Sequence, residues 1–208
     1  MSIDLRCFTY VNILQPQTAG FLGTVSQGYH PLEGNAALFI EVSPGMDINV
    51  VTDIALKSTS VKPGMMIVER HYGALELHHA DQGQIHTAGA TILNELGVQE
   101  SQRLRPRIVS AQTLTGIEGY QAQIVNRMRH GNFLLENETL YVLEVHPAGY
   151  ALLAANEAEK AANINVLEFR AVGAFGRVYL GGSEANIEEA AKAALNALAQ
   201  IDGRPNEE

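Results

Sequence analysis

The chain repeats itself at a nearly constant spacing, and this duplication constrains its fold more than any other feature. The matches keep an offset of 103 residues through most of the first half, then continue at 102 after a one-residue shift. Chance similarity gives scattered matches rather than one steady offset, so we expect two tandem copies of one unit, at residues 1–100 and 101–208. The matched pairs include Ala19 with Ala122, Gly28 with Gly131, Glu41 with Glu144, Pro44 with Pro147, Lys57 with Lys160, Gly73 with Gly176 and Ile85 with Ile187.

Both copies have the same order of expected elements. An extended segment and a weakly periodic segment come first, followed by a strand of alternating apolar residues, an alanine-rich helix, two further strands and a final helix. Antiparallel strands with helices packed on them predict an α+β fold, here two tandem ferredoxin-like domains. The segments before the final helix are residues 5–11 and 106–112, 16–28 and 116–128, 36–44 and 139–147, 48–59 and 150–162, and 67–77 and 168–180.

The ends of the final helices have local signals. Ser183 is placed to cap the second of these helices, and Gly97 is placed to stop the first. The second helix also shows an apolar stripe that predicts its buried face. The stripe consists of Ile187, Ala191, Ala194, Leu195, Leu198 and Ile201.

Charge and composition argue against several classes of partner and location. A net charge of −9 does not suit nucleic acid, whose phosphates need a basic face, or an anionic membrane surface. No apolar run approaches the ~18 residues of a membrane span, and the start does not resemble a signal peptide, so we expect a cytoplasmic protein. Cys7 is the single cysteine and lies in an apolar strand, which predicts a core position.

A cluster of histidines is the strongest indication of metal binding or catalysis. His78, His79, Asp81 and His86 lie within nine residues, at a strand end and a helix entrance. However, the chain has no H-E-x-x-H helix, nucleophile elbow or phosphate-binding loop. We therefore expect an exposed loop here, and no catalytic residue, metal or cofactor.

Several linked motifs resemble the bacterial microcompartment shell domain. They are LYVLEVHPAGYALLAANEAEKAANINV, at residues 140–166, and VGAFGRVYLGGSEANIEEAAKAALNAL, at residues 172–198. Each copy begins with the strand and helix that normally close this domain, so the chain resembles the circularly permuted tandem group. The segments VSPG and VERHYG are similar to those of the double-layer carboxysome members. This resemblance implies homotrimers that form pseudohexagonal discs, which can stack in pairs.

The resemblance also implies that two loops face the threefold axis of the disc. The pore residues that it implies are Glu69, Arg70, His71, Tyr72 and Gly73 in one copy, and Gly173, Ala174, Phe175 and Gly176 in the other. Glu69 and Arg70 would then form a gate by pairing across the axis, and each exposed pair is worth only about 0–1 kcal/mol. Arg70 would favour anions such as phosphorylated metabolites, and His71 would add sensitivity to pH. Outside this family, a Glu-Arg pair in a hairpin loop is most often a solvated turn.

Three basic residues are candidates for contacts between neighbouring discs. Lys57 and Lys160 hold the same place in the two copies, at the end of the alanine-rich helix, and the resemblance implies that they lie at the disc edge. The alternative is a solvated lysine that is favoured by the helix dipole. Arg204 is a further candidate, although it has no clear counterpart in the first copy. It lies in a polar C-terminal segment, residues 202–208, that we expect to fray.

These features lead to a structural shell protein with a gated pore for metabolites. The implied partners are further copies of the chain and the hexameric and pentameric shell proteins of the same compartment, without nucleic acid or membrane. Two alternatives remain open. Ferredoxin-like repeats also build trimeric regulatory proteins that bind small molecules, and a shell component can act as a closed structural cap without transport.

Overall fold

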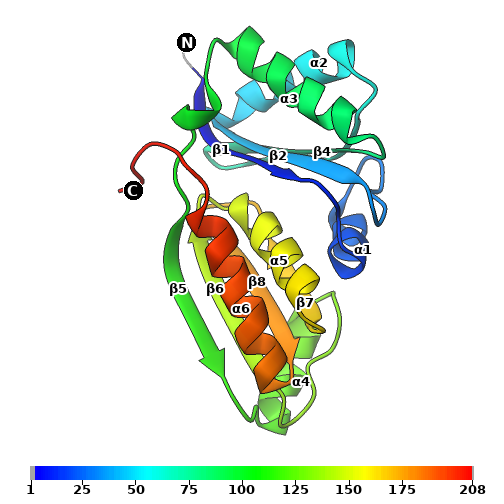
Figure 1. The fold of residues 1–208 in the computed structure, drawn as a ribbon, viewed down its shortest axis with the longest axis vertical. Coiled ribbons are helices and arrows are strands. Elements are labelled where there is room, and N and C mark those ends of the chain that lie inside the picture. Colours follow the sequence, from blue (N-terminus) through cyan, green and yellow to red (C-terminus); the bar gives the residue numbers. More distant parts are fainter. Residues whose placement is uncertain (1–2, 208) are drawn as a thin grey trace.

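The computed structural model describes residues 3–207 and contains two four-stranded antiparallel sheets (Figure 1). The first has the strand order β1-β2-β4-β3 and the second the order β5-β6-β8-β7. The first half consists of β1 (Asp4–Val11), α1 (Pro16–Val25), β2 (Ala36–Ser43), α2 (Ile48–Ser58), β3 (Lys62–Glu69), β4 (Tyr72–His79) and α3 (Gln82–Leu96). The second half consists of β5 (Arg107–Leu114), α4 (Gly119–Met128), β6 (Thr139–His146), α5 (Tyr150–Ala161), β7 (Asn165–Arg170), β8 (Gly176–Gly182) and α6 (Glu184–Ala199).

The positions of these elements follow the repeat found in the sequence. β1, α1 and β2 begin and end 103 residues before β5, α4 and β6, and α3 begins 102 residues before α6. The α+β class and the order of elements are confirmed. The local signals at the helix ends also hold, because the Ser183 side chain accepts from the Asn186 amide and Gly97 ends α3 in the left-handed conformation, at φ 65°.

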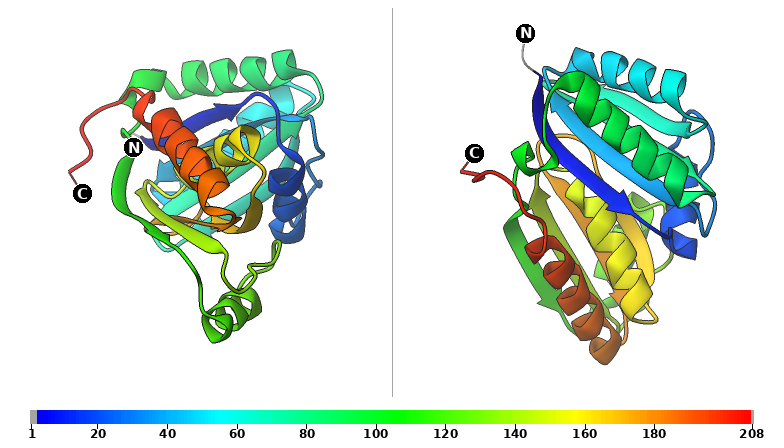
Figure 2. Two further views of the ribbon diagram at one scale, coloured as in Figure 1. Left: turned by 60° about the horizontal axis from the view of Figure 1, so that its bottom comes forward. Right: turned by 45° about the horizontal axis from the view of Figure 1, so that its top comes forward.

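Helix α5 is the central layer of the molecule. The first sheet carries α2 and α3 on one face, while its other face packs on α5, which lies with α6 on the second sheet (Figure 2). The first half of α5, from Tyr150 to Ala155, is buried without interruption. A Cβ atom added to Gly149 would lie 2.7 Å from the Phe39 ring and 2.8 Å from Cys7 Sγ, so helix and sheet touch closely here. Cys7 is in the core, as predicted.

Helix α1 extends the contact between the two halves. It reaches across to α5 and β7, where the rings of Phe21 and Phe169 lie 4.7 Å apart. At the start of α1, the Glu159 carboxylate accepts hydrogen bonds from the backbone amides of Gln17 and Thr18, at 2.7 and 2.8 Å. A negative charge is favoured at this end of a helix because the amides there lack partners within the helix.

The other face of the second sheet is covered only at one end, where α4 packs beside Leu140 and Leu167, and the rest of that face has no cover within the described chain. β2 is buried at every residue except Ser43, since helices lie on both sides of it. In contrast, most of β5 is exposed, and residues of β6 that face away from α5, such as Val142 and Glu144, are only half-buried.

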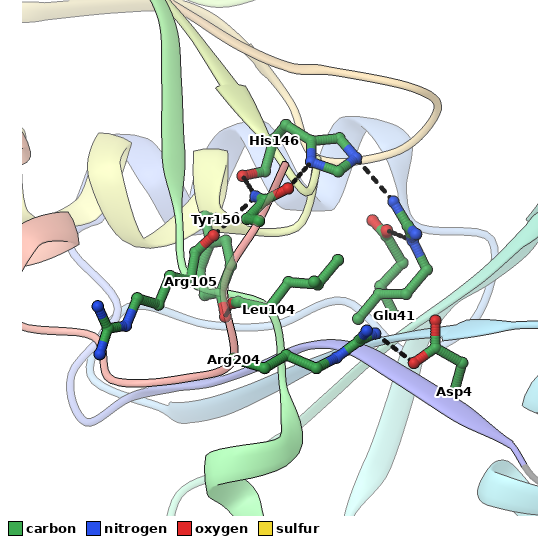
Figure 3. Close-up of polar contacts among 9 residues, drawn as sticks. Asp4, Glu41, Leu104, Arg105, His146, Tyr150 and Arg204 are labelled. Carbon is green, nitrogen blue, oxygen red and sulfur yellow. Dashed lines mark hydrogen bonds and ion pairs between the residues drawn. The ribbon is translucent and has the colours of Figure 1, made fainter. Parts of the chain in front are cut away.

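The C-terminal segment is held in place, so the expectation that it frays is wrong for the residues described. Arg204 forms a backbone bridge with Leu104, and its guanidinium bonds to the Gln102 carbonyl and to the Asp4 carboxylate, the latter shown in Figure 3. Asn206 donates to the carbonyls of Arg105 and His146, at 2.7 and 2.9 Å. The segment therefore joins β1, the connection between the halves and the end of β6.

Candidate functional site

The first candidate pore loop is a tight hairpin between β3 and β4. Glu69 pairs with Tyr72 across the hairpin, which leaves Arg70 and His71 as a two-residue turn. Both turn residues are exposed, and Arg70 has a φ of 55°. This left-handed conformation costs a residue other than glycine about 1–2 kcal/mol. The turn thus keeps an arginine at a position where glycine would be more stable, which favours a role for its side chain.

The second loop is wider than its counterpart. β7 ends at Arg170 and β8 begins at Gly176, so five residues from 171 to 175 connect the strands. Gly173 has a φ of 101°, which only glycine adopts readily. A Cβ atom added to Gly173 would lie 3.8 Å from Cγ of Glu69, so the two loops of one chain are neighbours.

Gly73 and Gly176 lie behind the loops rather than on their exposed side. Both are buried, and a Cβ atom on Gly73 would overlap the carbonyl oxygen of Gly45. On Gly176 it would overlap the carbonyl oxygen of Ala148. These two glycines therefore let the segment before each alanine-rich helix cross the start of β4 or β8.

The matched aromatic residues Tyr72 and Phe175 anchor the loops on a buried polar network. The Arg6 guanidinium lies over the Tyr72 ring, 3.8 Å from its centroid, and the ring of Phe175 lies 5.9 Å from that of His146. Arg6 itself bonds to Glu41 Oε1 at 2.9 Å and to Nε2 of His146 at 2.7 Å. Figure 3 shows Glu41 and His146 close to each other in this network.

Glu41 is the acidic member of this network. Burial raises the pKa of Glu41 to about 7, although the hydrogen bond and the charge of Arg6 oppose the shift. The nearby backbone amides of Ala148 and Gly149 also favour its charged form, although Oε2 makes no hydrogen bond to the described residues. The carboxylate thus points at the segment before α5.

The histidine cluster is split between the interior and the surface, so the expectation of one exposed loop is wrong for His78. This residue is buried in β4, with Nδ1 3.2 Å from the Glu76 carboxylate. His79 accepts from the Asp81 amide, and His86 packs on the ring of Tyr10. Residues 3–207 contain no group of three or more side chains arranged to hold a metal ion, and no helix that could cross a membrane.

The three candidates for edge contacts lie in different environments. Lys57 pairs with Asp53 at 2.7 Å and Lys160 with Glu157 at 3.2 Å, and both ammonium groups are exposed at the ends of the matched helices α2 and α5. The Arg204 guanidinium is engaged within the chain, with Asp4 and Gln102. Its role at an edge stays a prediction, as do those of the two lysines.

Sequence reasoning missed Arg6 and His146. Signals for both existed, because Arg6 interrupts an apolar strand and Glu41 interrupts the strand that pairs with it. A buried charge needs a partner, so two opposite charges in neighbouring buried strands predict an ion pair. The third partner, His146, is 140 residues from Arg6 in sequence, and no local pattern could have paired them.

Similarity to known proteins agrees with this architecture. Residues 5–102 match the family model described as the CsoS1D N-terminal domain. The chain is 50% identical over 204 residues to the carboxysome shell protein CcmP of Synechococcus elongatus, covering 98% of this chain and 96% of that protein. It is 44% identical over 200 residues to the carboxysome shell protein CsoS1D of Prochlorococcus marinus, covering 96% of this chain and 78% of that protein.

Two solved structures have the same fold over nearly their whole length. The fused permuted hexameric shell protein MSM0275 from the RMM microcompartment has a TM-score of 0.94 and 46% identity, covering 97% of this chain and 99% of its own. The double ringed trimeric shell protein MSM0271 from the same microcompartment also has a TM-score of 0.94, with 37% identity and coverage of 98% and 100%. The chain therefore belongs to the family of permuted tandem-domain microcompartment shell proteins that includes CcmP and CsoS1D.

Proposed function

We propose that the chain is a shell tile of a carboxysome-like compartment in the cytoplasm. In this proposal residues 1–100 and 101–208 are two shell domains, and three chains close into a pseudohexagonal disc. The two candidate pore loops of each chain then surround the axis and admit small metabolites. The observation that carries the proposal is that the second sheet offers an open face where the first sheet is covered by α5.

The repeat predicts what covers that face. α5 matches α2 at the offset of 103, so the contact of α5 with the first sheet would recur as a contact of α2 with the second sheet of a neighbouring chain. Such a contact joins two different surfaces, and contacts of this kind build closed rings. The surface that would be presented includes three exposed apolar side chains, Met46 just before α2 and Val50 and Leu56 within it.

Matched residues differ in size in a way that fits this contact. Gly149 packs on Phe39 and Cys7 within the chain. At the offset of 103, Gly149 corresponds to Met46, Phe39 to Val142 and Cys7 to Ser110. The second sheet has a hollow of about 130 Å³ beside these smaller residues, lined by Ser110, Val142, Leu143, Glu144, Arg177 and Tyr179. Met46 is 68% exposed in the single chain, and its side chain would fill the hollow of a neighbour.

A second matched pair supports the same surface. Phe21 and Phe169 are in contact within the chain, and their counterparts are Ile124 and Met66. Both counterparts are exposed in the single chain, and they would meet across the boundary between two chains. Apolar side chains at matched positions of two uncovered surfaces are expected where those surfaces bind each other.

The gate is assigned to Glu69 and Arg70. Threefold copies of these side chains would pair across the axis in a closed state and swing to the wall in an open state. Arg70 favours anions, for example phosphorylated metabolites, while the small residues Gly173 and Ala174 leave room. His71, exposed beside Arg70, adds sensitivity to pH near neutrality.

The edges of the tile are assigned to Lys57 and Lys160, with Arg204 as a weaker candidate. Their long stems can pack across an edge while the ammonium groups bond to carbonyls of the next tile. The neighbours at these edges would be the hexameric and pentameric shell proteins of the same compartment. Stacking of two discs would place one gate on each side of a chamber.

The first test is the solution mass over a range of concentrations. A mass near three times 22.5 kDa, or twice that value for stacked discs, is expected for the unchanged protein. Met46→Glu should reduce it to that of a monomer. Leu135→Glu is the matched control, because Leu135 corresponds to Leu32, which remains exposed despite the contact between the halves. A monomer at every concentration would contradict the disc.

The gate is tested by solute entry into assembled shells. Removal of the Glu69 and Arg70 side chains should increase entry and reduce the preference for anions over neutral solutes of equal size. Unchanged entry would indicate a closed cap. An oligomer that binds a small molecule and forms no sheets would indicate the regulatory class of protein.

A further inference from the structure

A chain of four side chains joins the two candidate pore loops through the interior. Tyr72 lies under the Arg6 guanidinium at 3.8 Å, Arg6 bonds to His146 at 2.7 Å, and the His146 ring contacts that of Phe175 at 5.9 Å. We call these four residues the loop link. It begins at one loop, crosses from the first half of the chain to the second, and ends at the other loop.

Each end of the link is bound to the conformation of its loop. Tyr72 directly follows the turn residues Arg70 and His71, and Phe175 is the last residue of the second loop. Both rings are half-buried, and each lies directly beside its loop backbone. The two inner members are on strands, Arg6 near the start of β1, where its pairing with β2 shifts register, and His146 at the end of β6.

The inner members are held from further sides. Arg6 and His146 are buried, and Glu41 holds the Arg6 Nε at 2.9 Å. Because Arg6 can only donate, Nε2 of His146 accepts from it, and Nδ1 then carries the hydrogen that bonds to Oδ1 of Asn206 at 2.9 Å. Asn206 is fixed in turn by the carbonyls of Arg105 and His146.

We propose that Arg6 and His146 are positioning residues that make the two pore loops of one chain change conformation together. The inference deepens the proposed pore function and rests on it. Buried, fully packed groups tend to occupy discrete arrangements rather than deform continuously. A shift of Tyr72 therefore displaces the guanidinium and the imidazole, and Phe175 follows. An alternative route is direct contact between the loops, because a Cβ atom added to Gly173 would lie 3.8 Å from Cγ of Glu69.

Hydrogen exchange of the loop amides distinguishes the two routes. Arg70→Gly changes the first loop without altering any member of the link, and exchange is then measured in peptides that cover residues 171–176. With the link intact, we expect Arg70→Gly to change the hydrogen-exchange rate of the second loop by about threefold or more relative to the unchanged protein. In a His146→Phe background, which keeps the ring against Phe175 but removes both nitrogens, that change should be lost.

Two further variants control the experiment. Phe175→Leu cuts the link near the surface and should also abolish the change, so it provides the test if His146→Phe fails to fold. His30→Phe is the matched control, because His30 is an exposed histidine outside the link, and transmission should remain. If Arg70→Gly changes the exchange rate of the second loop equally with the loop link intact and in the His146→Phe or Phe175→Leu background, the coupling passes through the Glu69–Gly173 contact instead. No change in any background would also overturn the proposal.

Failure of the coupling and failure of the pore are separate results. The exchange experiment needs no transport, so it reports on the link even if solute entry is unaffected by Glu69 and Arg70. Conversely, a pore that responds to those residues while the loops exchange independently would retain the proposed function and exclude the link.

Discussion

The first sheet is covered by helices on both faces, whereas one face of the second is covered only at the end where α4 packs, and the matched residues at the two surfaces differ accordingly. Within the chain, Glu159 bonds to the backbone of Gln17 at the start of α1. The matching residues Leu56 and Tyr120 are both apolar in character and exposed. A contact between tethered halves needs little affinity of its own and already includes the apolar core around α5, so polar bonds are sufficient at this position. A contact between separate chains must offset the lost freedom of association, and apolar burial supplies that free energy.

The largest expected effect comes from the pair Phe21 and Ile124. Phe21→Ala removes a buried ring and should lower the free energy of unfolding by about 3–5 kcal/mol. Ile124→Ala changes an exposed side chain in the single chain, so it should weaken the trimer and leave the fold of the chain intact. Denaturant unfolding and solution mass at matched concentrations check both. Equal losses of fold stability would remove the distinction between the two surfaces.

An intermediate effect is expected from Glu41, which matches Glu144. The pKa of Glu41 is raised from 4.5 to about 7, so between these pH values the folded state keeps a proton that the unfolded state has released. Its contribution to the free energy of unfolding therefore falls as pH rises, by up to about 1.4 kcal/mol per unit, and is constant above about 7.

Glu41→Gln removes this dependence, so the variant should gain stability relative to the unchanged protein between pH 4.5 and 7. Unfolding curves at several pH values measure the difference. Glu144→Gln is the matched variant, because its carboxylate pairs with Arg177 on the open face. If the difference in free energy of unfolding between Glu41→Gln and the unchanged protein does not vary with pH, the raised pKa of Glu41 is contradicted.

The smallest effect concerns the two loops. Arg70→Gly should raise the free energy of unfolding by about 1 kcal/mol, because it relieves the left-handed conformation at φ 55°. Gly173→Ala should lower it by a similar amount, since φ is 101° there. Unfolding midpoints measure both. Two changes of the same sign would show that backbone conformation does not govern either loop.

The sequence predicted features that depend on local pattern or on the repeat itself. Ser183 and Gly97 end their helices as expected because capping needs only neighbouring residues. The width of the second loop was not predicted, because the match of Gly73 with Gly176 does not show how many residues pair across each turn. The position of those glycines depends on a crossing segment from elsewhere in the chain, at Gly45 or Ala148.

Long-range polar contacts were also beyond prediction from sequence. The adjacent residues His78 and His79 differ in burial because both faces of β4 are covered and His79 is its last residue, and the sequence does not show that both faces are covered. Asn206 is held because His146 and Arg105 meet at the connection between the halves. Pairs so distant in sequence need the fold before they can be recognised.

The connection between the halves also bears on how a ring would assemble. A short tether holds its two ends at an effective concentration on the order of millimolar, far above that of a protein made in small amounts. The contact of α5 with the first sheet therefore forms as the chain folds, whatever the number of copies present. In a ring of six domains, half of the contacts between neighbouring domains would lie within single chains and would form before any two molecules meet. Closure of the ring would then require three molecules rather than six, so the ring would assemble at a lower protein concentration.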